Sequence, residues 1–121
     1  MGEGASPRAD SGQVRSFRET AIVAALRDGT AGDLSGPTHE GLDLAGANLR
    51  GVDLRHVNLR TADLRGAYCK GVDLRGVDLS EAKLEGASFH LARISGAYFP
   101  KNVAAEELMM SLDLGTRIRC R

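Results

Sequence analysis

A five-residue repeat runs without interruption from Leu42 to Lys101, and it restricts the fold of this chain more than any other feature. The twelve pentapeptides read LDLAG, ANLRG, VDLRH, VNLRT, ADLRG, AYCKG, VDLRG, VDLSE, AKLEG, ASFHL, ARISG and AYFPK. The third residue of each is apolar, and this central column consists of Leu44, Leu49, Leu54, Leu59, Leu64, Cys69, Leu74, Leu79, Leu84, Phe89, Ile94 and Phe99. The first residue is Ala or Val in every repeat from Ala47 onward. Both columns are therefore predicted to face an interior.

The period of five matches neither the 3.6-residue period of a helix nor the two-residue alternation of a long strand. Apolar–polar–apolar triplets such as residues 52–54 resemble very short strands. The fifth position supplies a turn residue between them, since it is glycine at positions 46, 51, 66, 71, 76, 86 and 96. We expect the chain to wind into an all-β solenoid with one short side per pentapeptide.

The repeats ANLRG and ADLRG match the pattern A(D/N)LXX, and the whole array resembles the pentapeptide-repeat family. This resemblance implies a right-handed quadrilateral β-helix with four pentapeptides per coil, so twelve repeats make about three coils. It also implies that the central column and the small residues two positions before it point inward as structural core. A coil of twenty residues stacks Leu44, Leu64 and Leu84, and it places Cys69 between Leu49 and Phe89.

The flanking segments divide the rest of the chain. Residues 1–15 are rich in Gly, Ser and charge and are predicted to be a disordered tail. Residues 16–41 are predicted to form a helix over 16–28 and a linker over 29–41. A capping box from Ser16 to Glu19 starts this helix, Gly29 ends it, and its apolar face is Phe17, Ala21, Ile22, Ala25 and Leu26. In the linker, residues 32–36 keep the phase of the repeats and His39 breaks it.

A second helix is expected in residues 102–121, after the solenoid over 42–101. Asn102 is the predicted cap of a helix from Val103 to Leu114, Glu106 and Glu107 suit its first turn, and Gly115 stops it. The buried candidates are Leu108, Met109, Leu112 and Val103. The helix is either a lid on the last coil or a dimerisation helix like those at the C-terminal ends of some relatives. Leu108, Met109 and Leu112 are therefore candidate interaction residues.

The chain ends in a basic tail over residues 116–121. Alternation places Arg117, Arg119 and Arg121 on one side of an extended segment, which makes them candidate interaction residues. They could dock on an acidic protein surface or contact phosphates, although three arginines give only weak and salt-sensitive nucleic-acid binding. The alternative is an extra strand along the last coil whose arginines point into solvent.

No motif predicts an enzyme. The sequence contains no GxxxxGK, GxGxxG, GxSxG or HExxH pattern, so we predict no catalytic residue, no cofactor and no metal. The three histidines are His39, His56 and His90, and the last two fall on different sides and different coils. Cys69 occupies an inward position and Cys120 is expected to be exposed. Their wide separation favours two reduced thiols over a disulfide framework.

Charge and hydropathy restrict the location and the partners. Sixteen basic residues balance sixteen acidic ones, so no overall field favours DNA or an anionic membrane. No apolar run approaches the roughly 20 residues that span a bilayer. The start MGEGASPRADSGQVR lacks the apolar stretch of a signal peptide, which predicts a cytoplasmic protein.

The resemblance to the family leaves two functional hypotheses. The family's best-known function is mimicry of DNA, in which a long and strongly acidic rod occupies the DNA-binding saddle of a type II topoisomerase. Residues 42–101 instead contain nine Lys or Arg against seven Asp or Glu. The primary hypothesis is therefore a non-enzymatic protein–protein interaction or scaffold module, with a homodimer through the C-terminal helix as one form of it. The alternative is a DNA mimic or nucleic-acid-linked regulator such as a topoisomerase (gyrase) inhibitor.

Overall fold

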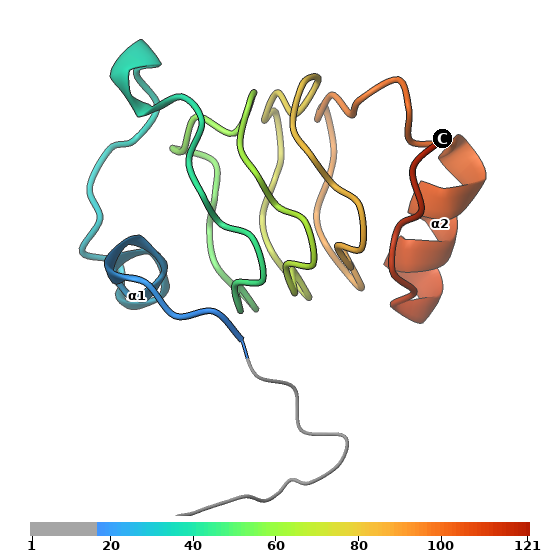
Figure 1. The fold of residues 1–121 in the computed structure, drawn as a ribbon, viewed down its shortest axis with the longest axis horizontal. Helices are drawn as coiled ribbons and strands as arrows, with labels where there is room; N and C mark the ends of the chain where they lie inside the picture. The colour runs from blue at the N-terminus through green and yellow to red at the C-terminus, as the bar shows by residue number, and fades with distance from the viewer. Residues whose placement is uncertain (1–16) are drawn as a thin grey trace, which may run out of the picture.

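The computed structural model describes residues 17–121, and the predicted disorder of residues 1–15 falls outside this range. The elements in chain order are helix α1 (Ala21–Asp28), the three-residue 3₁₀ helix η1 (Pro37–His39) and helix α2 (Ala105–Leu114). Between η1 and α2 the chain winds through the repeats as a stack of coils (Figure 1). Helix α1 lies at one end of this stack and α2 at the other (Figure 1).

The coils pair through the middle residue of each apolar–polar–apolar triplet. Parallel bridges join residues twenty positions apart: Asp43 with Asp63, Asp63 with Lys83, Asn48 with Tyr68, Tyr68 with Ser88, Asp53 with Asp73, Asp73 with Arg93, and Asp78 with Tyr98. The Asp63 N–H donates to the Leu42 carbonyl (2.9 Å) and the Asp63 carbonyl accepts from the Leu44 N–H (2.8 Å). Within residues 17–121 the pairing consists of isolated bridges rather than strands, because each triplet is followed directly by a turn. The twenty-residue coil is confirmed.

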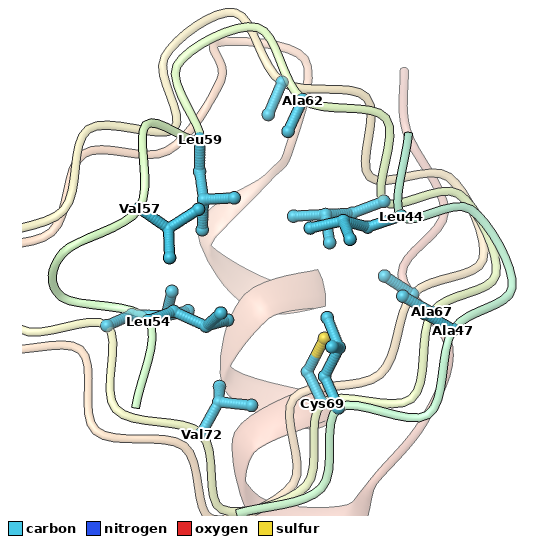
Figure 2. Packing of buried hydrophobic residues seen from close by; sticks show 14 of the residues in the cluster. Leu44, Ala47, Leu54, Val57, Leu59, Ala62, Ala67, Cys69 and Val72 are labelled. Carbon is cyan, nitrogen blue, oxygen red and sulfur yellow. The ribbon is translucent and has the colours of Figure 1, made fainter. Parts of the chain in front are cut away.

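The central column forms the core of the stack. Ten of its twelve residues, from Leu44 to Phe89, are buried, and they meet the small residues of the first column in the middle of the coil (Figure 2). Cys69 lies among them as predicted (Figure 2). Ile94 and Phe99 are only half-buried, although Phe99 makes an edge-to-face contact with Phe89 at 6.2 Å between ring centroids. The interior is therefore complete in the first two coils and incomplete in half of the third.

Helix α1 begins at Ala21, five residues after the predicted start at residue 16. Residues 17–20 precede it, and the cap is Thr20, whose hydroxyl accepts the Val23 N–H at 3.4 Å. The proposed capping box is wrong because Glu19 binds Arg27 (2.6 and 2.8 Å); Ser16 lies outside the described residues. Val23 and Leu26 are the buried residues of α1, whereas the predicted core-facing Ala21 is exposed. Gly29 ends the helix in the left-handed conformation, as predicted.

The linker joins the stack out of phase. Leu34 is buried and pairs with Val57, which is 23 positions away instead of 20. Its N–H donates to the His56 carbonyl and its carbonyl accepts from the Asn58 N–H. The helix η1 lies in this offset stretch and stands out from the coils (Figure 1). The Gly36 carbonyl also accepts from the Asn58 side-chain amide at 3.1 Å, so residues 32–36 bind the first coil without forming a regular repeat.

Helix α2 also begins later than predicted, because its N-cap is Ala104 rather than Asn102. The Asn102 carbonyl instead accepts the Arg121 N–H at 2.7 Å, which ties the start of this segment to the end of the chain. Glu106 and Glu107 stand in the first turn, and Gly115 ends the helix at φ 76°, both as predicted. Met109 was expected to be buried and is 54% exposed.

Candidate interaction site

Paired charges cover the sides of the coil stack. Three outward Asp residues each hold the Arg two positions later through two hydrogen bonds: Asp53 with Arg55 (2.9 and 2.8 Å), Asp63 with Arg65 (2.9 and 2.6 Å) and Asp73 with Arg75 (2.9 and 2.7 Å). The Arg75 guanidinium is the main cause that lowers the pKa of Asp73 to about 2. The same pairing lowers the pKa values of Asp53 and Asp63. These carboxylates are therefore already neutralised by their own chain.

Further pairs link neighbouring coils. Arg55 reaches Asp73 at 3.3 Å, and Arg60 approaches both Glu40 (3.8 Å) and Glu81 (3.0 Å). Because acidic and basic groups alternate at these distances, the sides of the stack carry no acidic stripe over residues 53–81. Such a surface gives weak electrostatic attraction to a charged partner at physiological salt.

Helix α2 and the tail cover one half of the last coil, over residues 82–91. The Phe89 N–H donates to the buried Ser111 hydroxyl (2.9 Å), which in turn donates to the Thr116 carbonyl (2.7 Å). The Leu91 N–H donates to the Leu112 carbonyl at 3.0 Å. The helix thus replaces the fourth coil as a partner for these backbone donors.

The tail adds an extended segment beside α2 (Figure 1). Ile118 is fully buried; its carbonyl accepts the Gly86 N–H and its N–H donates to the Ala87 carbonyl, both at 2.7 Å. The arginines on either side of Ile118 are exposed but held. Arg117 donates to the Gly86 carbonyl (2.9 Å), and Arg119 binds Glu107 (3.1 Å). The tail therefore runs along the last coil as an extended segment and not as a strand, with Ile118 as its inward contact and with Arg117 and Arg119 bound to the protein instead of free in solvent.

The candidate residues of α2 and the chain end occupy different environments. Leu108 and Leu112 are half-buried and pack against the core, whereas Met109 faces solvent together with Met110 and Leu114. Arg121 donates to the Lys101 carbonyl at 3.0 Å, so it secures the loop that leaves the last repeat. The C-terminal end therefore presents an apolar surface that is only partly used for packing.

Along the other half of the last coil, residues 92–99, no described segment is hydrogen-bonded to the backbone in the way that Ile118 is; we call this stretch the open edge. Within the described chain, the N–H groups of Ile94, Gly96 and Phe99 and the carbonyls of Ala92 and Ala97 have no hydrogen-bond partner. Each has a partner one coil earlier, where Leu74, Gly76 and Leu79 donate to the next coil at 2.8, 2.9 and 2.7 Å. Sequence reasoning did not find this edge.

Leu91 adjoins the open edge and was also missed by the sequence reasoning. It stands at the fifth position of its repeat, where most repeats have glycine at positive φ, and it adopts φ 61° itself. Its side chain is 62% exposed. The signal was present in the sequence, since ASFHL lacks the glycine that the neighbouring AKLEG and ARISG contain.

The family model described as pentapeptide repeats matches residues 33–66, 43–80 and 62–100, with eight copies, and these segments together span more than half of the chain. The chain belongs to the pentapeptide-repeat family. Comparisons with curated proteins and with solved structures give no match. The match begins at residue 33, so it includes the out-of-phase segment around Leu34.

The thiols of this pentapeptide-repeat protein are poor nucleophiles. Burial raises the pKa of Cys69 to about 12. Partial burial also raises the pKa of Cys120, and the neighbouring Glu85 carboxylate adds to the effect. Cys120 borders a cleft of about 750 Å³ whose walls include Leu84, Phe99 and Pro100. The cleft lies next to the candidate site at the C-terminal end and contains no activated thiol.

One histidine of the pentapeptide-repeat protein contacts the C-terminal helix. His90 Nδ1 lies 3.2 Å from the Leu112 carbonyl, so His90 contributes to the seating of α2. In the described range, residues 17–121, no group of three or more His, Cys, Asp or Glu side chains is arranged to hold a metal ion. Over the same range, no helix has the length and apolar character that crossing a membrane requires.

Proposed function

We propose that this pentapeptide-repeat protein is a non-enzymatic protein–protein interaction or scaffold module that presents its C-terminal end to a partner. The observation that carries the proposal is the contrast between its surfaces. The sides pair their own charges, whereas the C-terminal end exposes large apolar side chains, with Leu114 72% and Tyr98 67% accessible. Large apolar side chains exposed at one end of a small protein favour an interaction surface there.

We further propose that the coils wind as the right-handed quadrilateral β-helix that the family implies. The parallel bridges at twenty-residue spacing and the buried central column support this geometry. Such a column is expected to be rigid, because ten of the twelve central side chains are buried in a packed interior. A rigid column suits a scaffold, since it binds without ordering a flexible surface first.

The proposal includes no catalytic step and places the protein in the cytoplasm. Two free cysteines, one of them buried in the core, suit a reducing compartment. Two forms of association remain within the proposal: a different protein, or a second copy bound through Met109, Met110 and Leu114 of α2. The DNA-mimic alternative receives little support, because Asp53, Asp63 and Asp73 are neutralised by their own arginines.

Site-specific photocrosslinking tests the proposed function. A photoreactive amino acid is placed at Met110 or Leu114, with Arg50 on a side of the stack as the matched control, and the full chain is irradiated in native extract. We expect protein adducts from the two C-terminal positions and few from Arg50. Light scattering of the purified protein distinguishes a second copy from a different protein. Inhibition of DNA supercoiling at micromolar protein, or adducts spread equally over all three positions, would overturn the proposal.

A further inference from the structure

We propose that the open edge, residues 92–99, binds an extended acidic peptide segment of a partner protein, which adds to the last coil as half of a fourth coil. This inference rests on the proposed function, because it names the site and the partner chemistry of an interaction module. Added strands of this kind gain affinity from backbone hydrogen bonds and specificity from alternate side chains.

The backbone of the open edge is arranged for such a strand. The unpaired Ile94 N–H and Ala92 carbonyl stand in the positions that Leu74 and Val72 occupy one coil earlier, and those two residues pair with Arg93 at 2.8 and 2.9 Å. The Phe99 N–H and Ala97 carbonyl likewise correspond to the groups of Leu79 and Val77 that pair with Tyr98, at 2.7 and 3.0 Å. A peptide can repeat both pairs and also accept from Gly96 in between.

The inward side chains of the open edge would be buried by apolar residues of an added strand. Leu74 and Leu79 are fully buried because Ile94 and Phe99 lie over them in the next coil. Ile94 and Phe99 are themselves only half-buried. A strand with apolar side chains on its inward face would remove this remaining apolar surface from water.

The covered half of the same coil shows that this chain already uses the arrangement. There an extended segment presents Ile118 inward, exchanges two backbone hydrogen bonds with Gly86 and Ala87, and buries its side chain completely. The open edge has the same kind of backbone and the same kind of interior. It differs in that no described segment occupies it.

The charge at the open edge selects an acidic peptide over a second copy. Arg93 and Lys101 are exposed, and within residues 17–121 neither forms an ion pair. The middle residue of an added triplet would lie directly over Arg93, where an acidic side chain is favourable and a basic one is not. Two copies joined symmetrically by this edge would bring Arg93 and Lys101 together with their equivalents.

Amide hydrogen exchange of the full-length protein gives the first test. We expect the amides of Ile94, Gly96 and Phe99 to exchange much faster than those of Leu74, Gly76 and Leu79, which occupy the same positions one coil earlier. Protection of the first group in the isolated monomer would mean that a segment of this chain covers the edge. Protection in a dimer would mean that a second copy covers it. Either result would overturn the proposal.

A designed peptide gives the second test. The probe is VDLEGVDL with blocked ends, which is residues 72–79 with the change Arg75→Glu, so that it can form all five backbone bonds and place aspartate over Arg93. We expect NMR shifts confined to residues 91–99 and slowed exchange at Ile94, Gly96 and Phe99. The control is the same peptide N-methylated at its first aspartate, which cannot donate to Ala92 and should not bind.

Charge exchange makes the assignment specific. Arg93→Glu should weaken binding of the probe about fivefold and should improve binding of the peptide VKLEGVDL by a similar factor. Arg50→Glu, the matched change on a side of the stack, should leave both affinities unchanged. Equal binding by all variants, or shifts that map to the cleft beside Cys120, would overturn the proposal. Crosslinks from Met110 and Leu114 would still stand in that case, so the two proposals can fail separately.

Discussion

Leu91 holds a backbone conformation that seven other repeats assign to glycine. Its φ of 61° is close to the 71° of Gly71, which occupies the same position one coil earlier. A non-glycine residue in this region is strained by roughly 1–2 kcal/mol. The strain supports a large apolar side chain that faces solvent next to the open edge, so the residue weakens the fold while enlarging the proposed binding surface.

This comparison gives a prediction for a pair of reciprocal variants. Leu91→Gly should raise the free energy of unfolding by about 0.5–1 kcal/mol, since relief of strain exceeds the added freedom of the unfolded chain. Gly71→Leu should lower it, although there is open space around the position and only the backbone opposes the change. Urea unfolding measures both free energies, provided that the dependence of the free energy on urea concentration is the same in the variants and the wild type. A less stable Leu91→Gly variant would show that the side chain contributes to folding instead.

Leu74 and Ile94 belong to the same column and test how the core changes along the stack. Leu74→Ala should lower the free energy of unfolding by about 2–5 kcal/mol, because it opens a cavity between two packed coils. Ile94→Ala should cost clearly less, because Ile94 is already half-exposed. Leu74→Asp should prevent folding, which circular dichroism would detect. Equal costs at the two positions would contradict the incomplete last coil.

At the scale of elements, α2 is fixed by hydrogen bonds as well as by the apolar contacts of Leu108 and Leu112. Ser111 is its one buried residue, and its hydroxyl connects the Phe89 N–H to the Thr116 carbonyl. Ser111→Ala should lower the free energy of unfolding by about 1–3 kcal/mol, since both backbone groups lose their partner inside the protein. Ser95→Ala, on the exposed surface of the last coil, is the control and should change it by less than about 0.5 kcal/mol. Thermal denaturation of the wild type and of the two variants measures these changes, and equal effects of Ser111→Ala and Ser95→Ala would contradict the role of Ser111.

The sequence predicted the coils better than the starts of the helices, because the coils depend on a local repeat and the helix starts depend on contacts between residues that are distant in the sequence. The period of five, which every repeat restates, predicted the short sides, and the resemblance to the family supplied the twenty-residue register of the coils. The helix starts were not predicted: the caps are Thr20 and Ala104, while Glu19 binds Arg27 and the Asn102 carbonyl accepts from Arg121. These long-range contacts leave no local pattern.

The candidate site was predicted less well than the coils, for a geometric reason. The alternation of residues in the tail predicted that three arginines share one side. It did not predict that Ile118 contacts the last coil, because that contact depends on the position at which α2 ends. Met109 fitted the apolar face of a helix, but it is exposed, and Leu108 and Leu112 are the residues of α2 that pack against the core. The open edge is the part of the last coil to which no described segment is hydrogen-bonded, and no single residue of the sequence indicates it.

In the whole molecule, the charges on the sides of the stack are paired with one another, and the two ends differ in how completely they are covered. At the N-terminal end, α1 packs Val23 and Leu26 against the core, and Leu34 completes a side of the first coil. At the other end the covering is partial. Because a solenoid passes contacts only between neighbouring coils, the free surface of the last coil does not weaken the first two. The protein can therefore keep an incomplete end as a binding site.

The paired charges predict how the stability of the whole column depends on pH. The pKa values of Asp53, Asp63 and Asp73 lie below their ordinary value of 3.8 in the folded protein, and that of Asp73 is about 2. A lowered folded pKa stabilises the protein above the unfolded value, and this contribution is lost as the pH falls through the folded value. The melting temperature should therefore stay nearly constant from about pH 7 to 5 and fall between about pH 4 and 2. Arg75→Gln removes the main partner of Asp73, so this variant should melt below the wild type at neutral pH, and the gap should close near pH 2. A gap that persists at low pH would mean that Arg75 stabilises the coils by packing, and a decline that begins above pH 5 would point to groups other than these carboxylates.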